Sequence, residues 1–122
     1  AVYNPNSSAN EMLDRKMAEY AQAVCHGRPC FHISLVQDIS PNCDCHGEND
    51  APILPDIGMF ASFDPVALDQ ACVDLVYEAP DGDSLIRRIE SRNGIHTLEH
   101  AENIGVGSRG YELISVDFTV SQ

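Results

Sequence analysis

Basic residues are scarce in this chain of 122 residues. Seven Lys and Arg residues stand against 19 Asp and Glu residues, so the net charge is -12. No Lys or Arg occurs between Arg28 and Arg87. Binding to nucleic-acid phosphates or to an anionic membrane needs a basic patch, so the composition argues against both roles. Such an acidic chain favours a bound cation or a basic partner, and a solvated acidic face is the alternative explanation.

The chain also lacks a long apolar run, and its start lacks a basic segment followed by an apolar one. We therefore expect neither a transmembrane helix nor a signal peptide. Five cysteines are an odd number, which argues against a fully paired secreted disulfide framework. Clustered thiols in a reducing compartment are more often metal ligands or redox groups than disulfides, so we predict a cytoplasmic protein.

The apolar pattern predicts a single α/β domain over residues 1–122. Four segments have the periodicity or the start and stop signals of helices, and they are residues 10–27, 64–79, 83–92 and 96–104. Asp64 followed by Pro65 is a good helix start, because Asp accepts hydrogen bonds from free backbone N–H groups and Pro suits the first helical position. About four helices are therefore expected.

Three segments have strand signals. Residues 30–39 alternate apolar and polar positions and predict a half-buried strand, residues 57–62 predict a short buried strand, and residues 111–120 predict a final strand. We expect a small mixed sheet of three or more strands packed against the helices.

A long irregular loop, residues 40–55, contains the sequence Cys43-Asp44-Cys45-His46. A Cys-x-Cys pair can place two thiolates on one metal ion, but zinc or an iron–sulfur cluster takes about four ligands. Further ligands would come from one set of nearby donors: His46, Asp44, Cys30, His32, Cys25 and His26. Asp56 is expected to support a ligand from outside the coordination shell. The alternatives for this pair are a redox dithiol and loop cysteines without chemistry.

A second motif is His96-Thr97-Leu98-Glu99-His100, which matches H-x-x-E-H on a predicted helix. Two His residues four positions apart share a helix face and can bind zinc, with the Glu as general base. The alternative is an ordinary exposed helix face. The glycine-rich residues 105–110 lack the Lys-Ser/Thr of a phosphate-binding loop and are expected to form a turn.

Several segments, in order along most of the chain, resemble domain-of-unknown-function family 362. They are 17–21 (MAEYA), 41–45 (PNCDC), 51–58 (APILPDIG), 61–71 (ASFDPVALDQA), 96–107 (HTLEHAENIGVG) and Tyr111-Glu112-Leu113. Members are often described as iron–sulfur or ferredoxin-domain proteins. The resemblance implies the C-terminal portion of a longer protein with a separate ferredoxin-like module. Cys43, Asp44 and Cys45 match the family pattern, whereas Cys25, Cys30 and Cys72 lie outside its motifs, which disfavours them as ligands.

Together these observations predict a metal-binding or iron–sulfur-associated module of a redox, electron-transfer protein. Its metal ion or cluster, of zinc or iron, would be held by Cys43 and Cys45 with His46, while Asp44 and Asp56 tune charge or orientation. The expected partner is a redox protein or the ferredoxin module of the same parent chain. The alternatives are a metal-dependent hydrolase that uses His96, Glu99 and His100, and a non-catalytic acidic interaction domain.

Overall fold

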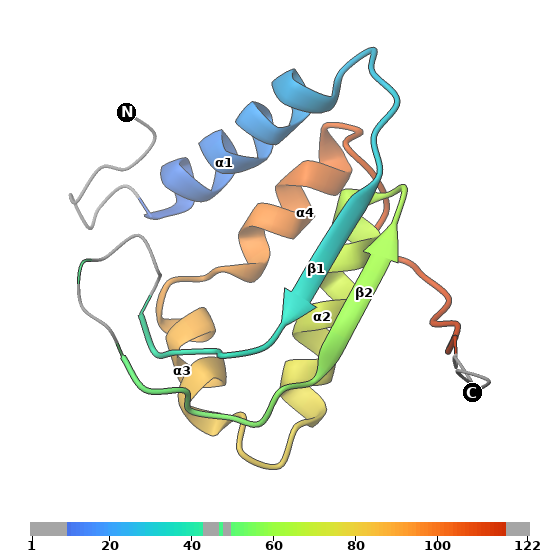
Figure 1. Cartoon of the computed structure of the whole chain (residues 1–122). Coiled ribbons are helices and arrows are strands. Elements are labelled where there is room, and N and C mark those ends of the chain that lie inside the picture. Colours follow the sequence, from blue (N-terminus) through green and yellow to red (C-terminus); the bar gives the residue numbers. More distant parts are fainter. Residues whose placement is uncertain (1–9, 43–46, 48–49, 117–122) are drawn as a thin grey trace, which may run out of the picture.

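The computed structural model describes residues 10–42, 47 and 50–116, and in this part of the chain four helices accompany a two-stranded sheet (Figure 1). The elements follow the order α1 (Asn10–Cys25), β1 (His32–Val36), β2 (Gly58–Ser62), α2 (Pro65–Glu78), α3 (Asp83–Ser91) and α4 (Ile95–Asn103). The predicted α/β class and the four predicted helices are confirmed. None of these helices is both long and apolar enough to cross a bilayer.

The prediction of three or more strands is wrong for the described residues. β1 and β2 form an antiparallel pair in which His32 lies opposite Ser62 and Val36 lies opposite Gly58. The third strand was expected over residues 111–120, and residues 111–116 are exposed and form no strand. Strand propensity reflects packing in a half-buried sheet more than an intrinsic backbone preference, so alternation alone does not produce a strand in this exposed segment. Residues 117–120 lie outside the described part of the chain.

One face of the sheet packs on α2, and the opposite face is exposed and apolar. Alternation along β1 directs His32, Ser34 and Val36 towards α2. The other face consists of large apolar side chains that are each more than half exposed, namely Phe31, Ile33, Leu35, Met59 and Phe63. The alternation of β1 was therefore predicted, but its large apolar residues lie on the exposed face. β2 is not a buried strand either, because Met59 is 68% exposed.

The hydrophobic core lies between the helices. α1 packs on α4, and α4 packs on α2 (Figure 1). Ala18 of α1 and Ala101 of α4 are buried with Val66 and Leu98, and such small residues allow two helix axes to approach closely. The Gln22 side chain also donates to a backbone carbonyl just beyond α4, at 2.6 Å.

The N-terminus of α2 is capped by Asp64, as predicted. Its Oδ1 atom accepts hydrogen bonds from the backbone N–H groups of Val66 and Ala67 at 2.9 and 3.1 Å. Its Oδ2 atom accepts a third bond, 2.8 Å long, from the N–H of Ser108. One carboxylate therefore both starts α2 and holds the segment that follows α4. Gly107 passes against this carboxylate so closely that a Cβ atom there would overlap it.

The same C-terminal segment is attached along α2 by side chains. Arg109 Nε donates to Gln70 Oε1 at 2.8 Å, and Gln70 Nε2 donates to Asp74 Oδ1 at 2.8 Å. The Tyr111 hydroxyl donates to Asp74 Oδ2 at 2.7 Å, and this hydrogen bond, with some desolvation, raises the pKa of Tyr111 to about 12. The glycine-rich residues 105–110 therefore serve as a turn that brings the chain back to α2.

The interface between α1 and α4 contains a buried carboxyl group, Asp14, which is 8% exposed. Its Oδ2 atom has no hydrogen-bond partner among the described residues. Desolvation raises the pKa of Asp14, although a hydrogen bond from Thr97 and the nearby His96 oppose this shift. Folding therefore favours the protonated carboxyl, and the ionised form destabilises the helix pair.

We expect Asp14→Asn to increase the free energy of unfolding at pH 7.5 by about 0.5–1 kcal/mol, because it removes a buried charge from the interface between α1 and α4. The gain is modest because the interaction of a partly screened charge with its surroundings is weak. The folded-state pKa of Asp14 is raised, so the wild-type carboxyl recovers this stability as the pH falls towards its ordinary pKa of 3.8. Urea unfolding at pH 7.5 and 4.5 checks both points. An equal difference between the two proteins at both pH values would contradict the explanation.

Candidate metal centre

Cys25, Cys30 and His32 bring three metal-ligating side chains together where α1 gives way to β1. One ligand atom from each residue lies within 4.8 Å of the other two, and all three side chains are half-buried. Among the residues that the structure describes, no other group of three His, Cys, Asp or Glu side chains is gathered in this way. The two thiols are not in a disulfide.

The local fold explains why these residues meet. Cys25 is the last residue of α1, and the Arg28 N–H donates to the Cys25 carbonyl at 3.2 Å, which begins a tight turn. Gly27 has φ +68°, a left-handed conformation that glycine adopts without the strain of a side chain. Pro29 then cannot continue the helix, and β1 starts at His32. The chain thus reverses direction within a few residues and folds the strand start back beside the helix end.

The two cysteine thiols are half-buried and interact with one another. Desolvation raises the pKa of the Cys25 thiol, and the adjacent Cys30 raises it further through a hydrogen bond and through charge repulsion between thiolates. Cys30 Sγ lies 3.5 Å from the Arg28 carbonyl oxygen, at thiol hydrogen-bonding distance. Desolvation and the adjacent Cys30 both disfavour the Cys25 thiolate, whereas a bound cation would favour it, because a coordinating thiol is deprotonated outright.

The third ligand supplies an observation that points to a ligand at this site. His32 Nε2 is shut off from solvent and has no hydrogen-bond partner in the described part of the chain. A buried polar atom without a partner destabilises a fold by about 1–3 kcal/mol. Coordination of a metal ion by Nε2 itself would remove that penalty, because the ion would give this nitrogen a partner.

The donor set limits the metals that fit. Two thiolates and one imidazole suit zinc and also suit ferrous iron or cuprous copper, whereas calcium and magnesium prefer oxygen ligands. Zinc–sulfur bonds are about 2.3 Å long, so a small movement of the side chains from their present positions would close the site. Three protein ligands leave one position of a tetrahedral ion open to water or to another ligand.

Asp69 of α2 lies close enough to His32 for the two charges to interact. Desolvation raises the pKa of the Asp69 carboxyl, and His32 acts in the opposite direction by favouring its ionised form. A carboxylate near a metal-binding imidazole commonly orients the ring and increases its basicity. Cys72, one turn further along α2, hydrogen-bonds Ser34 of β1 and is not part of the three-residue group.

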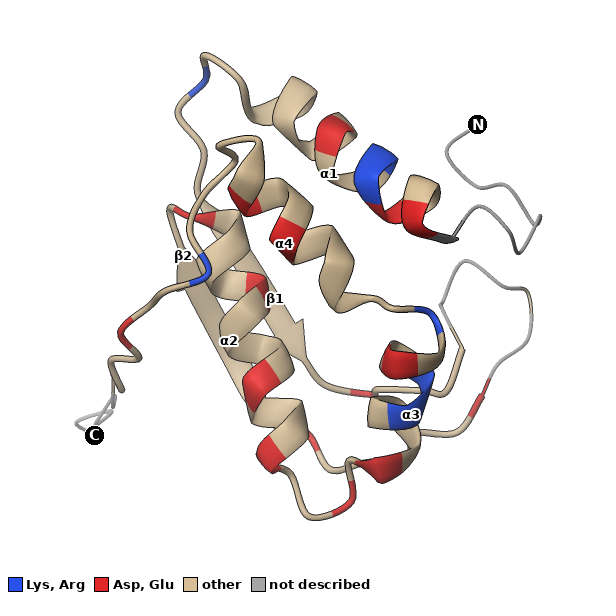
Figure 2. Ribbon diagram, turned by 180° about the vertical axis from the view of Figure 1, so that it is seen from behind, with Lys and Arg blue, Asp and Glu red and all other residues tan. Residues whose placement is uncertain are grey.

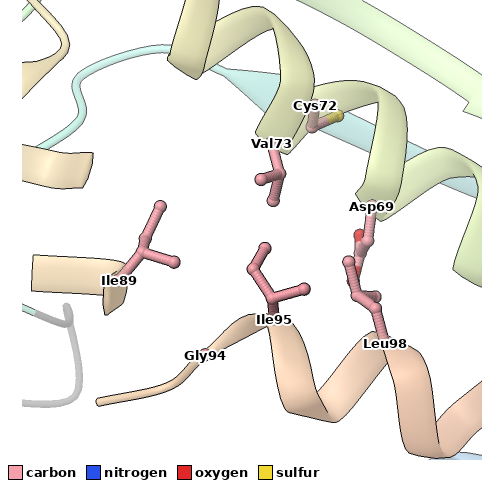
Figure 3. A pocket seen from close by; sticks show the side chains of 7 residues that line it. All are labelled: Asp69, Cys72, Val73, Ile89, Gly94, Ile95 and Leu98. Atoms are coloured by element: carbon pink, nitrogen blue, oxygen red, sulfur yellow. The ribbon is translucent and has the colours of Figure 1, made fainter. Parts of the chain in front are cut away.

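Asp69 and Cys72 also line a cavity of about 250 Å³ between α2, α3 and α4 (Figure 3). Its other walls are largely apolar, and Val73 and Ile95 point towards one another across it (Figure 3). Asp69 is the one charged side chain among the residues that line this cavity, and it also interacts with His32.

The loop residues predicted from the sequence as ligands, Cys43, Asp44, Cys45 and His46, lie outside the described residues, and their metal-binding role stays a prediction. Asp56 is described, and its Oδ1 accepts a hydrogen bond from the Asp38 N–H at 2.9 Å. The Ile53 N–H donates to the Ile39 carbonyl at 2.8 Å. Backbone and carboxylate hydrogen bonds therefore close the base of this loop, just beyond the end of β1 opposite the three-residue group.

The H-x-x-E-H motif lies on α4 and faces α1. Arg15 Nε donates to His96 Nε2 at 3.3 Å, and His100 Nε2 lies 3.2 Å from Glu19 Oε1. His96 Nδ1 lies 3.6 Å from Glu99 Oε2. The two imidazole rings are 6.4 Å apart between centroids, and no third ligand joins them among the described residues. These polar pairs connect α1 to α4, so the hydrolase alternative gains no support from this part of the chain.

The grouping of Cys25, Cys30 and His32 was not predicted as a site of its own, although each residue was a candidate to complete the loop site. The signal was the spacing C-x4-C-x-H across a Gly and a Pro, directly after a helical pattern. That spacing is informative only when the helix ends at Cys25, because one more helical turn would carry the thiol away from the strand.

A family comparison agrees with the resemblance noted in the sequence. The family model for domain of unknown function DUF362 matches residues 3–74, which is more than half of the chain. The chain belongs to the DUF362 family. The match covers Cys25, Cys30 and His32 as well as the 43–46 segment. Neither the comparison with curated proteins nor the one with solved structures gave a match. Family membership therefore supplies no reaction, and the side chains must carry the functional argument.

Proposed function

We propose that this DUF362 chain binds a thiophilic metal ion through Cys25, Cys30 and His32, with zinc or ferrous iron as the ion. The observation that carries this proposal is the gathering of two sulfur atoms and an imidazole nitrogen within 4.8 Å of one another. The buried, unpartnered Nε2 atom of His32 supports it, since an ion coordinated by that nitrogen would give it a partner. Asp69 orients His32 from the side of α2.

The ligand set favours a single ion over an iron–sulfur cluster at this position. Common clusters are held by about four thiolates, and this group supplies two. A cluster would need other thiols, and Cys43 and Cys45 are the pair that the sequence resemblance suggests. We therefore propose two separate thiol pairs, the first holding a mononuclear ion.

A redox role is the finer part of the proposal. The family resemblance suggests a module of an electron-transfer protein whose partner is a redox protein or a ferredoxin module of the same parent chain. The acidic interaction domain is a weaker alternative. Figure 2 shows Asp and Glu distributed over α1, α2, α4 and the connecting segments instead of gathered on one element. Such a distribution is typical of a solvated surface.

Metal content tests the proposal directly. We expect anaerobically purified chain, loaded with zinc or ferrous iron and then desalted, to retain about one ion per chain at the three-residue group, as in mononuclear sites of this ligand type. Cys25→Ser combined with Cys30→Ser should lower that content by about tenfold or more, because no two-thiolate site remains there. Elemental analysis together with a visible absorption spectrum measures both the amount and the kind of metal centre.

Two matched controls locate the metal. Cys72→Ser removes a half-buried thiol outside the group and should leave the content unchanged. Cys43→Ser with Cys45→Ser removes the other pair of thiols. If the variant with Cys43→Ser and Cys45→Ser lost the metal while the variant with Cys25→Ser and Cys30→Ser retained it, the ion would belong to the 43–46 segment and the proposal would be wrong.

A further inference from the structure

The two thiols of the candidate metal centre are placed for a second chemistry. Cys25 Sγ and Cys30 Sγ lie within 4.8 Å of one another, and both residues are partly exposed. The residues between them belong neither to α1 nor to β1. A turn of this kind, with Gly27 in a left-handed conformation, can adjust more easily than a helix or strand, because few hydrogen bonds hold it.

We propose that a peroxide oxidises Cys25 and Cys30 to a disulfide, and that this reaction releases the metal ion from the site. The release rests on the proposed metal-binding function, whereas formation of the disulfide does not. The metal centre then holds its ion only while the two thiols are reduced, and the bound ion reports the redox state of its surroundings.

The geometry requires a short approach of the sulfur atoms. A disulfide has an S–S distance of about 2.05 Å and a Cβ–Cβ distance of about 3.5–4.5 Å. Rotation about the Cα–Cβ bonds, with a small adjustment of residues 26–29, can bring the sulfur atoms from their present separation to that distance. The spacing of five positions closes a small loop, so little chain entropy opposes the bond.

The reaction balances without any other reactant. One thiolate attacks a peroxide oxygen, the O–O bond breaks, and a sulfenic acid forms, while the hydroxide or alkoxide that leaves takes up a proton from the solvent to form water or an alcohol. The second thiolate attacks the sulfenic sulfur, the S–O bond breaks, and hydroxide leaves and takes up a proton to form water. The two sulfurs lose two electrons in total and the peroxide gains them. The disulfide sulfurs carry no negative charge, so the ion is left with His32 and dissociates.

Cys72 offers an internal comparison. Its thiol hydrogen-bonds Ser34, desolvation and the nearby Asp69 raise its pKa, and no second cysteine joins it within the described residues. It therefore lacks the partner thiol that Cys25 and Cys30 have in one another. Oxidation should distinguish it clearly from the Cys25 and Cys30 pair.

Digestion before Asp residues separates the thiols in the full chain. Residues 14–37 carry Cys25 and Cys30 together, residues 38–43 and 44–49 each carry one loop cysteine, and residues 69–73 carry Cys72. Zinc-loaded full-length protein is treated with hydrogen peroxide, alkylated, digested and analysed by mass spectrometry. A chromophoric chelator follows the released zinc in the same samples.

We expect the 14–37 peptide to become resistant to alkylation, to lose two hydrogens, and to be converted to a disulfide at least about tenfold more completely than the Cys72 peptide, because each of its thiols has a partner nearby. Zinc should be released at the same rate as the disulfide forms, and dithiothreitol should restore both thiols and the binding of zinc. Cys72→Ser should behave like the wild type. His32→Ala should weaken zinc binding but still form the disulfide.

The possible failures have different meanings. The redox proposal would be wrong if the 14–37 peptide could still be alkylated after zinc had been lost. It would also be wrong if the only disulfide linked the peptides of Cys43 and Cys45. A disulfide in a protein that never held zinc at these residues would overturn the metal function and the release, while the thiol pair itself would stand.

Discussion

Replacing Gly107 with Ala is expected to lower the free energy of unfolding by about 2–4 kcal/mol. A Cβ atom at this position would overlap the Asp64 carboxylate, which is held by three backbone N–H groups. The carboxylate would have to rotate away, so α2 would lose its N-cap and the Ser108 N–H would lose its acceptor. The free-energy costs of losing the N-cap and the hydrogen bond to Ser108 add together, because the Asp64 side chain provides both interactions.

A second glycine of the same segment gives the matched control. At Gly110 an added Cβ would meet only Ser108 Oγ, at an ordinary contact distance of 3.6 Å. Gly110→Ala should therefore change the stability by less than about 0.5 kcal/mol. Chemical denaturation monitored by circular dichroism compares the two variants under identical conditions.

A double-mutant cycle identifies the cause of the effect. Once Asp64 is replaced by Ala, the overlap is gone and Gly107→Ala should cost at most about 1 kcal/mol. If Gly107→Ala destabilised the Asp64→Ala protein as strongly as the wild type, the clash with the carboxylate would not be the reason, and backbone strain at residue 107 would have to be considered.

The helix prediction succeeded because it depended on local rules. Asp64 before Pro65 marks the start of α2, and the Asn93-Gly94 pair falls between α3 and α4, in agreement with the gap between the predicted helices 83–92 and 96–104. Each of these signals acts within one turn of the chain. No knowledge of the neighbouring elements is needed to place a helix start of this kind.

The sheet was predicted less well because its faces depend on partners distant in the sequence. Alternation in β1 showed two different faces but not which one α2 would cover. α2 meets the face of His32 and Ser34, where its Asp69 and Cys72 interact with those side chains, and Ile33 and Leu35 are left exposed. The polar groups of α2 that meet this face stand 37 and 38 residues further along the chain than the β1 residues with which they interact, so a local pattern in β1 does not contain this information.

The candidate site was predicted only in part, because it too depends on how separate elements meet. The sequence indicated metal binding by thiols and included Cys25, Cys30 and His32 among the possible donors, but ranked them below the Cys-Asp-Cys-His loop. Their grouping depends on where α1 stops and on which side of β1 its first residue points. A shift of one residue in the register of β1 would place His32 on the opposite face of the strand.

Zinc at about a thousandfold above its dissociation constant is expected to raise the free energy of unfolding by up to about 4 kcal/mol. The reason is mass action: the folded chain presents Cys25, Cys30 and His32 together, and the unfolded chain does not. Binding to separate thiols of the unfolded chain reduces the gain, so about 2–4 kcal/mol is the expected range. Thermal or urea unfolding at several zinc concentrations, under reducing conditions, measures it.

Variants divide this stabilisation among the residues of the site. Cys25→Ser and His32→Ala should remove most of it, whereas Cys72→Ser should retain it. Asp69→Asn keeps all three ligands but loses the charge that orients His32, so zinc should bind about 10–100-fold more weakly. At a fixed zinc concentration that loss corresponds to about 1.4–2.7 kcal/mol less stabilisation.

The stabilisation should also depend on pH, with a definite sign. Zinc displaces the thiol protons, and desolvation together with Cys30 raises the pKa of Cys25 above its ordinary value of 9.0. Protons therefore compete more strongly as the pH falls, and each displaced proton weakens binding by up to about tenfold per pH unit. The zinc effect should shrink from pH 8 to pH 6 in the wild type. A zinc effect that persisted unchanged in Cys25→Ser, or that grew as the pH fell, would show that the ion stabilises the chain at some other place.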